Sequence, residues 1–156
     1  MSAVRRAGPD DAREVLRLRQ VMIDSMAGAP SSTRWQGRSL PGLRARLAGG
    51  EGDFAAFVVD HPDRPGALAA LVVGTPEYRI GRPGDPDGTV GHVFGVATDP
   101  AARRRGHARA RMTALLVWFR ERGAGHVALA SSAEAEPLYA ALGFVRDSHP
   151  SMRLYL

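Results

Sequence analysis

Residues 93–112 read VFGVATDPAARRRGHARARM and carry the most information about the fold. A short apolar run ends in Asp-Pro and is followed by three arginines, Gly106 and a long helical pattern, so the segment predicts a strand, a loop and a helix in succession. Gly106 lets the backbone approach a ligand closely, and a helix start leaves several N–H groups without intrahelical partners. With the positive end of the helix dipole, these donors predict an anion site over residues 104–109, most often for a phosphate. The alternative is an arginine cluster that is solvated at a helix start.

Two motifs resemble the GNAT N-acetyltransferase superfamily. The segment RRRGHA at 103–108 is similar to its Gln/Arg-x-x-Gly-x-Gly/Ala signature, and PLYAALGF at 137–144 is similar to its Leu-Tyr-x-x-x-Gly-Phe segment. The closing MRLYL at 152–156 is similar to its last strand. Because the motifs stand in the family's order, the chain is identified as a small single-domain bacterial member. The clear resemblance covers roughly residues 90–156, and the first half fits in outline.

Hydrophobic spacing and turn residues alone predict one α/β domain. The expected strands lie at 4–7, 54–59, 67–73, 90–98 and 127–130, and the expected helices at 15–26, 39–47, 106–122 and 133–142. Two stretches, 28–37 and 74–88, are expected to be loops. The resemblance implies the GNAT fold, a mixed, mostly antiparallel sheet flanked by helices, with a splayed strand pair at the cofactor site. It also implies one domain over 1–156, with a cofactor half at about 90–156 and acceptor-side elements at about 8–50 and 74–89.

Composition bounds the function classes. The 156 residues are 44% hydrophobic and 24% charged, which is typical of a soluble globular domain. No apolar run approaches the ~20 residues of a membrane span, and the N-terminus has no apolar signal core, so a cytoplasmic protein without a membrane partner is expected. With no cysteine, the chain has no disulfide, no thiol nucleophile and no cysteine-based metal site, and no metal is expected.

The basic residues carry less information than usual. All 21 are arginine, which together with the many alanines and glycines is typical of a GC-rich genome. The net charge of +5 suits an anionic cofactor or nucleic acid. The arginines occur in every third of the chain, however, and no basic stripe with interleaved aromatics is present. Nucleic-acid binding through residues 103–105, helped by outward arginines at 109, 111, 120 and 122, is therefore the less favoured hypothesis.

The resemblance implies acetyl-coenzyme A as the cofactor. Loop amides would hold its pyrophosphate, and a backbone N–H near Val96 to Thr98 would meet the thioester oxygen. Thr98 stands where the family usually has valine, and Ser132 where many members have a cofactor-binding asparagine. His107 is expected to face solvent. The candidate cofactor residues are Val96, Ala97, Thr98, Arg103, Arg104, Arg105, Gly106, His107, Ala108, Arg109 and Ser132.

Two residues are candidates for proton transfer. The resemblance implies that Tyr139 lies beside the cofactor sulfur and protonates it, and a phenol with a pKa near 10 carries its proton at neutral pH. The alternative is a core or surface tyrosine. Strand alternation places His92 on one face with Phe94, Val96 and Thr98. His92 would act as a base through water, since it lies roughly 13 Å from Val96 at about 3.3 Å per residue. Its alternative is a surface histidine, and Glu134 and Glu136 are lesser candidates.

The acceptor site is expected on the side opposite the cofactor, between residues 22–40 and 74–89. The expected contact residues are Met26, Trp35, Tyr78 and Arg79, although Trp35 could instead anchor its loop. The favoured function is transfer of an acetyl group to a primary amine by direct attack in a ternary complex. The alternative is a module that binds an acyl-coenzyme A without turnover. The sequence leaves open which small-molecule or peptide amine is the acceptor, and whether the chain forms a homodimer.

Overall fold

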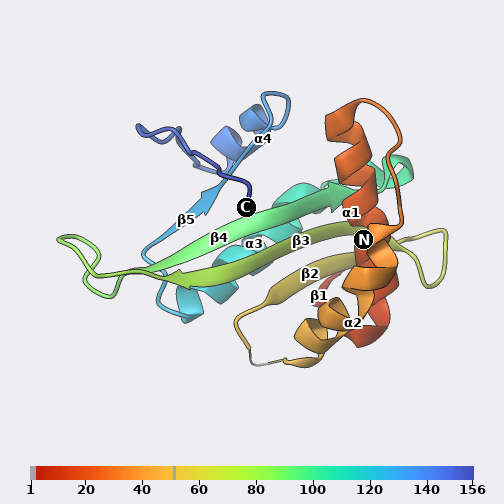
Figure 1. The fold of residues 1–156 in the computed structure, drawn as a ribbon, viewed down its shortest axis with the longest axis horizontal. Helices are drawn as coiled ribbons and strands as arrows, with labels where there is room; N and C mark the ends of the chain where they lie inside the picture. The colour runs from red at the N-terminus through yellow and green to blue at the C-terminus, as the bar shows by residue number, and fades with distance from the viewer. Residues whose placement is uncertain (1–2, 51) are drawn as a thin grey trace.

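The computed structural model describes residues 3–50 and 52–156, which form a sheet with helices on both faces (Figure 1). The elements in chain order are β1 (Val4–Arg6), η1 (Pro9–Asp11), α1 (Ala12–Ala27), α2 (Trp35–Ala48), β2 (Ala55–Asp60), β3 (Leu68–Tyr78), β4 (Thr89–Thr98), η2 (Pro100–Ala102), α3 (His107–Glu121), β5 (His126–Leu129) and α4 (Glu136–Ala141). The strands follow the order β1-β2-β3-β4-β5, antiparallel up to β4 and parallel between β4 and β5. The mixed, mostly antiparallel sheet is thus confirmed.

Each face of the sheet has its own apolar core. One core joins α1 and α2 to residues such as Leu71 and Ala97, and the other joins α3 to residues such as Val72 and Val93. On the α3 face, Phe119 lies directly on Gly74 of β3 and Gly91 of β4. A Cβ atom at these glycines would come within 2.6 Å and 2.7 Å of the ring, respectively. The two glycines therefore allow α3 to approach the sheet closely.

A bulge interrupts β4 next to β3. Val73 pairs with Gly95, but the next residue, Gly74, pairs with Val93, so Phe94 is an extra residue without a partner in the ladder. The extra residue reverses which residues face each helix layer. Phe94 contacts Phe54 on the α1 and α2 side, at 6.1 Å between ring centroids, whereas Val96 packs against the α3 core.

The bulge overturns one expectation from the sequence. Gly91 faces Phe119 of α3, so its neighbour His92 lies on the opposite face, where its ring is 6.2 Å from that of Phe94. His92 and Phe94 do share a face, but Val96 and Thr98 do not belong to it. The predicted alternation was wrong because a strict period of two holds only in a strand without an extra residue.

The β4–β5 pair separates after four residues. Residues 90–93 pair with 126–129, and β4 then continues to Thr98 while β5 ends at Leu129. Figure 1 shows β5 leaving the direction of β4 toward α4. On the other side, the N–H of Asp99 donates to Ala69 O at 2.8 Å. Because successive residues of a ladder point to opposite neighbours, the N–H groups of Val96 and Thr98 face the open side.

Several element boundaries differ from the expected ones. β3 continues to Tyr78, since residues 74–78 pair with 89–93 despite Gly74 and Pro76, so the expected loop there was partly wrong. α2 begins at Trp35 rather than Ser39, α4 is shorter than 133–142, and β5 begins one residue early. Residues 152–156 form no strand and are exposed, because no strand in the described ranges pairs with them. None of the helices in those ranges has the length and apolar character that a membrane crossing needs.

Candidate functional site

The loop after β4 is fixed at its start by Asp99, which is 3% exposed. Its carboxylate accepts hydrogen bonds from the Ala101 N–H at 2.9 Å, from Arg17 at 2.8 Å and from Arg64 at 2.5 Å. Burial by itself would raise the pKa of Asp99, but these donors outweigh it and hold the pKa below its usual value. The ionised Asp99 therefore anchors the loop that leads into α3.

The loop itself has the backbone shape of an anion site. Arg104 and Gly106 both have left-handed φ angles, 64° and 76°, and Gly106 caps the N-terminus of α3. For a non-glycine residue this conformation costs about 1–2 kcal/mol. Such turns direct successive N–H groups toward one concave side, next to the positive end of the helix. The geometry thus suits a phosphate, as the sequence predicts.

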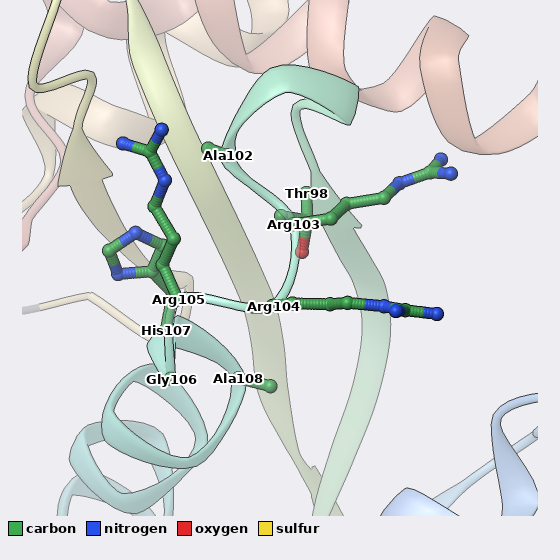
Figure 2. Close-up of a pocket in the computed structure, with 8 residues that line it drawn as sticks. All are labelled: Thr98, Ala102, Arg103, Arg104, Arg105, Gly106, His107 and Ala108. Carbon is green, nitrogen blue, oxygen red and sulfur yellow. The ribbon is translucent and has the colours of Figure 1, made fainter.

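A cavity of about 120 Å³ lies at this loop, lined by Thr98 and residues 102–108 (Figure 2). Figure 2 shows the side chains of Arg103 and Arg104 extending to one side of the loop and that of Arg105 to the other. Nη1 of Arg105 lies 3.8 Å from Oδ2 of Asp63. The candidate residues of this loop are therefore brought together by the fold, with Thr98 at the end of β4 beside them. Arg109, in the first turn of α3, is exposed.

His107 does not face solvent, contrary to the expectation. As the first residue of α3 it points inward, its side chain is buried, and its Nε2 atom has no hydrogen-bond partner among the described residues. Burial lowers the pKa of His107, and the charges of Arg111 and Arg105 lower it further. The ring is therefore neutral at pH 7 and lies under the loop.

Arg111 is the main site residue that sequence reasoning missed. It was expected on the outer face of α3, but it is 3% exposed. Its Nη1 donates to Ala97 O at 3.0 Å and to Thr98 Oγ1 at 2.7 Å, while its Nε has no partner and no described carboxylate pairs with it. Burial lowers its pKa to about 10, so it keeps its charge at neutral pH. The signal in the sequence was its spacing, because Arg111 stands four residues before Leu115 and eight before Phe119, both of which are buried.

Tyr139 of α4 lies close to this buried charge. Its ring is 7% exposed, packs in the α3-side core and meets Phe144 edge-on, with centroids 5.9 Å apart. Burial raises the pKa of the phenol, and the charge of Arg111 opposes that rise. Ser132, four residues before α4, is exposed, and its hydroxyl accepts the Ala135 N–H at 3.2 Å. The open side of β4, Tyr139 and the loop thus belong to one region.

A second cavity lies on the other face of the sheet, under α1 and α2. Its volume is about 230 Å³, and its walls include Leu16, Arg19, Trp35, Arg46, Phe54 and Phe94. Trp35, one of the residues predicted to contact the acceptor, lines this cavity, and its Nε1 donates to Gln20 Oε1 at 2.8 Å. Sequence reasoning missed the arginines, although Arg19 stands one helical turn after Val15, which also lines the cavity.

The other expected acceptor residues lie elsewhere. Met26 is 74% exposed near the end of α1 and does not line this cavity. Tyr78 donates its hydroxyl hydrogen to Asp53, and Arg79 pairs with Glu77 at 2.7 Å. His92 is exposed on the same face as the cavity but is not part of its wall. The fold therefore brings only Trp35 of the expected group to the cavity.

Three solved structures are similar to the chain over its whole length. The GCN5-related N-acetyltransferase of Ralstonia eutropha is 23% identical, with a TM-score of 0.78 and 99% of both chains covered. A predicted acetyltransferase of Clostridium acetobutylicum, crystallised with acetyl-CoA, is 17% identical with a TM-score of 0.81, over 99% of this chain and 96% of that one. Glucosamine-6-phosphate N-acetyltransferase of Arabidopsis thaliana is 18% identical with a TM-score of 0.74, over 99% of both chains. At these identities the likeness establishes the fold.

Sequence comparison extends this result beyond the fold. No curated protein matches the chain. A model of the acetyltransferase (GNAT) family, however, matches residues 26–144, which include the sheet from β2 onward, the anion-site loop and Tyr139. The match covers more than half of the chain. The chain therefore belongs to the GNAT acetyltransferase family.

Proposed function

We propose that the protein transfers the acetyl group of acetyl-CoA to a primary amine by direct attack in a ternary complex. The observation that carries the proposal is the loop with left-handed Arg104 and Gly106 at the N-terminus of α3, next to the open edge of β4. The family uses this cofactor, and the loop fits its phosphates. In this proposal the residues from about 90 onward hold the cofactor, and those of about 8–50 hold the acceptor.

When bound, acetyl-CoA supplies a thioester whose carbonyl carbon accepts the amine and whose sulfur leaves. The amides of residues 104–109 bind its diphosphate. The N–H groups of Val96 and Thr98 have no β5 partner, so one of them donates to the carbonyl oxygen as that oxygen gains negative charge. The bond between carbon and nitrogen forms as the bond between carbon and sulfur breaks.

Tyr139 gives its hydroxyl proton to the departing sulfur and recovers a proton from solvent. Its buried ring keeps the proton on the phenol at neutral pH, as a general acid requires. Arg111 acts here as a positioning residue. Its charge stabilises the phenolate that exists between the two proton transfers, and its hydrogen bonds to Ala97 and Thr98 fix the end of β4.

His92 accepts the proton of the attacking amine through water. The bulge at Phe94 favours this role, because it keeps His92 on the face with the second cavity and turns Val96 toward α3. Amine and thioester then meet at β4 from opposite faces. The reaction does not need a cysteine, since the amine attacks the thioester directly and no covalent enzyme intermediate forms.

The proposal is tested by calorimetric titration with acetyl-CoA, followed by a thiol-release assay with a panel of primary amines. Binding together with thiol release that depends on an amine is the expected result. Binding without release for every amine would favour a module that holds the cofactor without turnover. Absence of binding would contradict the assignment of the loop.

A further inference from the structure

We propose that the acceptor is an amine that also carries a carboxylate on an apolar body of amino-acid size. The apolar body occupies the cavity under α1 and α2, and Arg19 and Arg46 bind the carboxylate. The inference rests on the proposed acetyl transfer and defines the class of its acceptor.

The walls of the cavity suit an apolar body. Phe54 and Phe94 lie with their rings 6.1 Å apart, and Trp35 is held in place by its hydrogen bond to Gln20. A volume of about 230 Å³ equals about seven or eight water volumes. This is less than the ~300 Å³ at which pockets for drug-sized ligands begin. The cavity therefore fits a molecule of the size of one amino acid.

The charges of the cavity are all positive. Arg19 donates from Nη1 to the Phe94 carbonyl oxygen at 2.7 Å, and neither Arg19 nor Arg46 pairs with a carboxylate among the described residues. The lining residues include no Asp or Glu in the described ranges. Arginine binds carboxylates with a planar fork of N–H donors, so two guanidinium groups that meet no described carboxylate predict an anionic partner.

The cavity also lies at the correct distance from the chemistry. Phe94 and Gly95 form part of its wall and directly precede Val96, whose N–H is a candidate donor to the thioester oxygen. Arg19 is hydrogen-bonded to the Phe94 carbonyl oxygen, so a carboxylate bound to Arg19 lies beside residues 94–96. In an α-amino acid the amine is two bonds from the carboxylate carbon, and it therefore stays close to Val96.

The same charges exclude polycations. A polyamine or an aminoglycoside would need a carboxylate for its second ammonium group, but it would meet two guanidinium groups instead. The positive field also favours the neutral form of the attacking amine, which is the nucleophile. The structure thus separates amino acids from the polycationic acceptors that the sequence could not distinguish.

The test compares matched amines in the thiol-release assay and in calorimetric titration with CoA present. The pairs are phenylalanine with phenethylamine, and leucine with isopentylamine; spermidine is the polycation. We expect kcat/KM to be about 10–100-fold higher for the amino acid of a pair, as for a hydrogen-bonded charge. Arg46→Gln and Arg19→Gln should remove most of that preference, and Arg46→Glu should reverse it. Arg44→Gln is the matched control, exposed on the same helix and outside the cavity.

The inference is overturned if the plain amines or spermidine equal the amino acids, or if Arg46→Gln behaves like Arg44→Gln. It is also overturned if no amino acid binds in the titration. Because Arg19 also holds the Phe94 carbonyl, a loss of folding in Arg19→Gln leaves the decision to the two Arg46 variants. Amino acids that bind at Arg46 without thiol release would instead show that the proposed acetyl transfer fails while the cavity assignment stands.

Discussion

The anion-site loop and the cavity under α1 and α2 both contain arginines, but they use different atoms. In the loop, the backbone of residues 104–109 is the proposed donor, and the side chains of Arg103, Arg104 and Arg105 extend away from it to either side (Figure 2). In the cavity, the side chains of Arg19 and Arg46 are themselves the lining groups. In an arginine-rich chain, an arginine therefore indicates a binding site only when its hydrogen-bond partners are known.

The largest effect is expected for Gly106→Val, which tests the backbone as donor. A β-branched side chain at a left-handed φ of 76° forces the loop out of shape and enters the anion site, so acetyl-CoA binding should be lost. Calorimetric titration with acetyl-CoA measures the loss of binding. The matched control is Gly84→Val, since Gly84 also has a left-handed φ and open space around it but lies in the β3–β4 connection. Equal affinity in wild type and Gly106→Val would refute the loop assignment.

Tyr139→Phe tests whether the hydroxyl of Tyr139, which lies in the same region as the anion-site loop, is the general acid. Removing the hydroxyl deletes a positioned general acid, and the rate should fall by about 10²–10⁴-fold. Cofactor affinity should stay nearly constant, because the ring remains packed against Phe144. Single-turnover thiol release measures the rate. An unchanged rate would make Tyr139 a core residue.

Arg111→Met with Thr98→Val tests whether a buried arginine serves function at the expense of stability. Replacing an unpaired buried charge by apolar groups should raise the free energy of unfolding by about 1–4 kcal/mol. The acetyl-transfer rate should fall, since the charge of Arg111 lowers the pKa of Tyr139 and stabilises its phenolate. Urea unfolding and thiol release measure the two quantities. Lower stability in the double variant would show that Arg111 is structural.

Asp99→Asn tests the anchor of the loop through pH. The folded pKa of Asp99 lies below its unfolded value, so its stabilisation is present above the unfolded pKa of about 3.9 and is lost as pH falls through the folded pKa. The variant should therefore lose about 1.5–3 kcal/mol at pH 7 and much less at low pH. Thermal unfolding over pH 2.5–7 measures it. Asp87→Asn, at an exposed loop position, should leave stability unchanged throughout.

The smallest effect is expected for His92→Ala, which tests the acceptor face. A base that acts through water is partly replaced by solvent, so the rate should fall less than in Tyr139→Phe. Thiol release at a saturating amine concentration measures the rate. A rate identical to that of the wild type would leave deprotonation of the amine to water alone.

The two regions also differ in how far the sequence predicts them. The loop and Tyr139 could be recognised because their signals are local, a glycine at a helix start and a tyrosine in a short motif. Arg111 was predicted to point outward because of its charge, although it stands four residues before Leu115 and eight before Phe119, on the buried face of α3. The bulge at Phe94 depends on pairing with β3, and the extension of β3 through Pro76 likewise follows from long-range partners rather than from its own residues. The cavity under α1 and α2 depends on all of these features, and of the four residues predicted to contact the acceptor (Met26, Trp35, Tyr78 and Arg79) only Trp35 lines it.

Phe119 lies against Gly74 and Gly91 and so fixes the tilt of α3 at a point far from the anion-site loop. Phe119 stands twelve residues after His107, so a rigid helix places the two about 18 Å apart. A single methyl group at Gly91 would push the ring outward and tilt the whole helix, because the added Cβ has no room. The first turn of α3 would then meet the loop at a different angle. Gly74 and Gly91, which lie outside the anion-site loop, thus set the orientation of the N–H groups of residues 104–109.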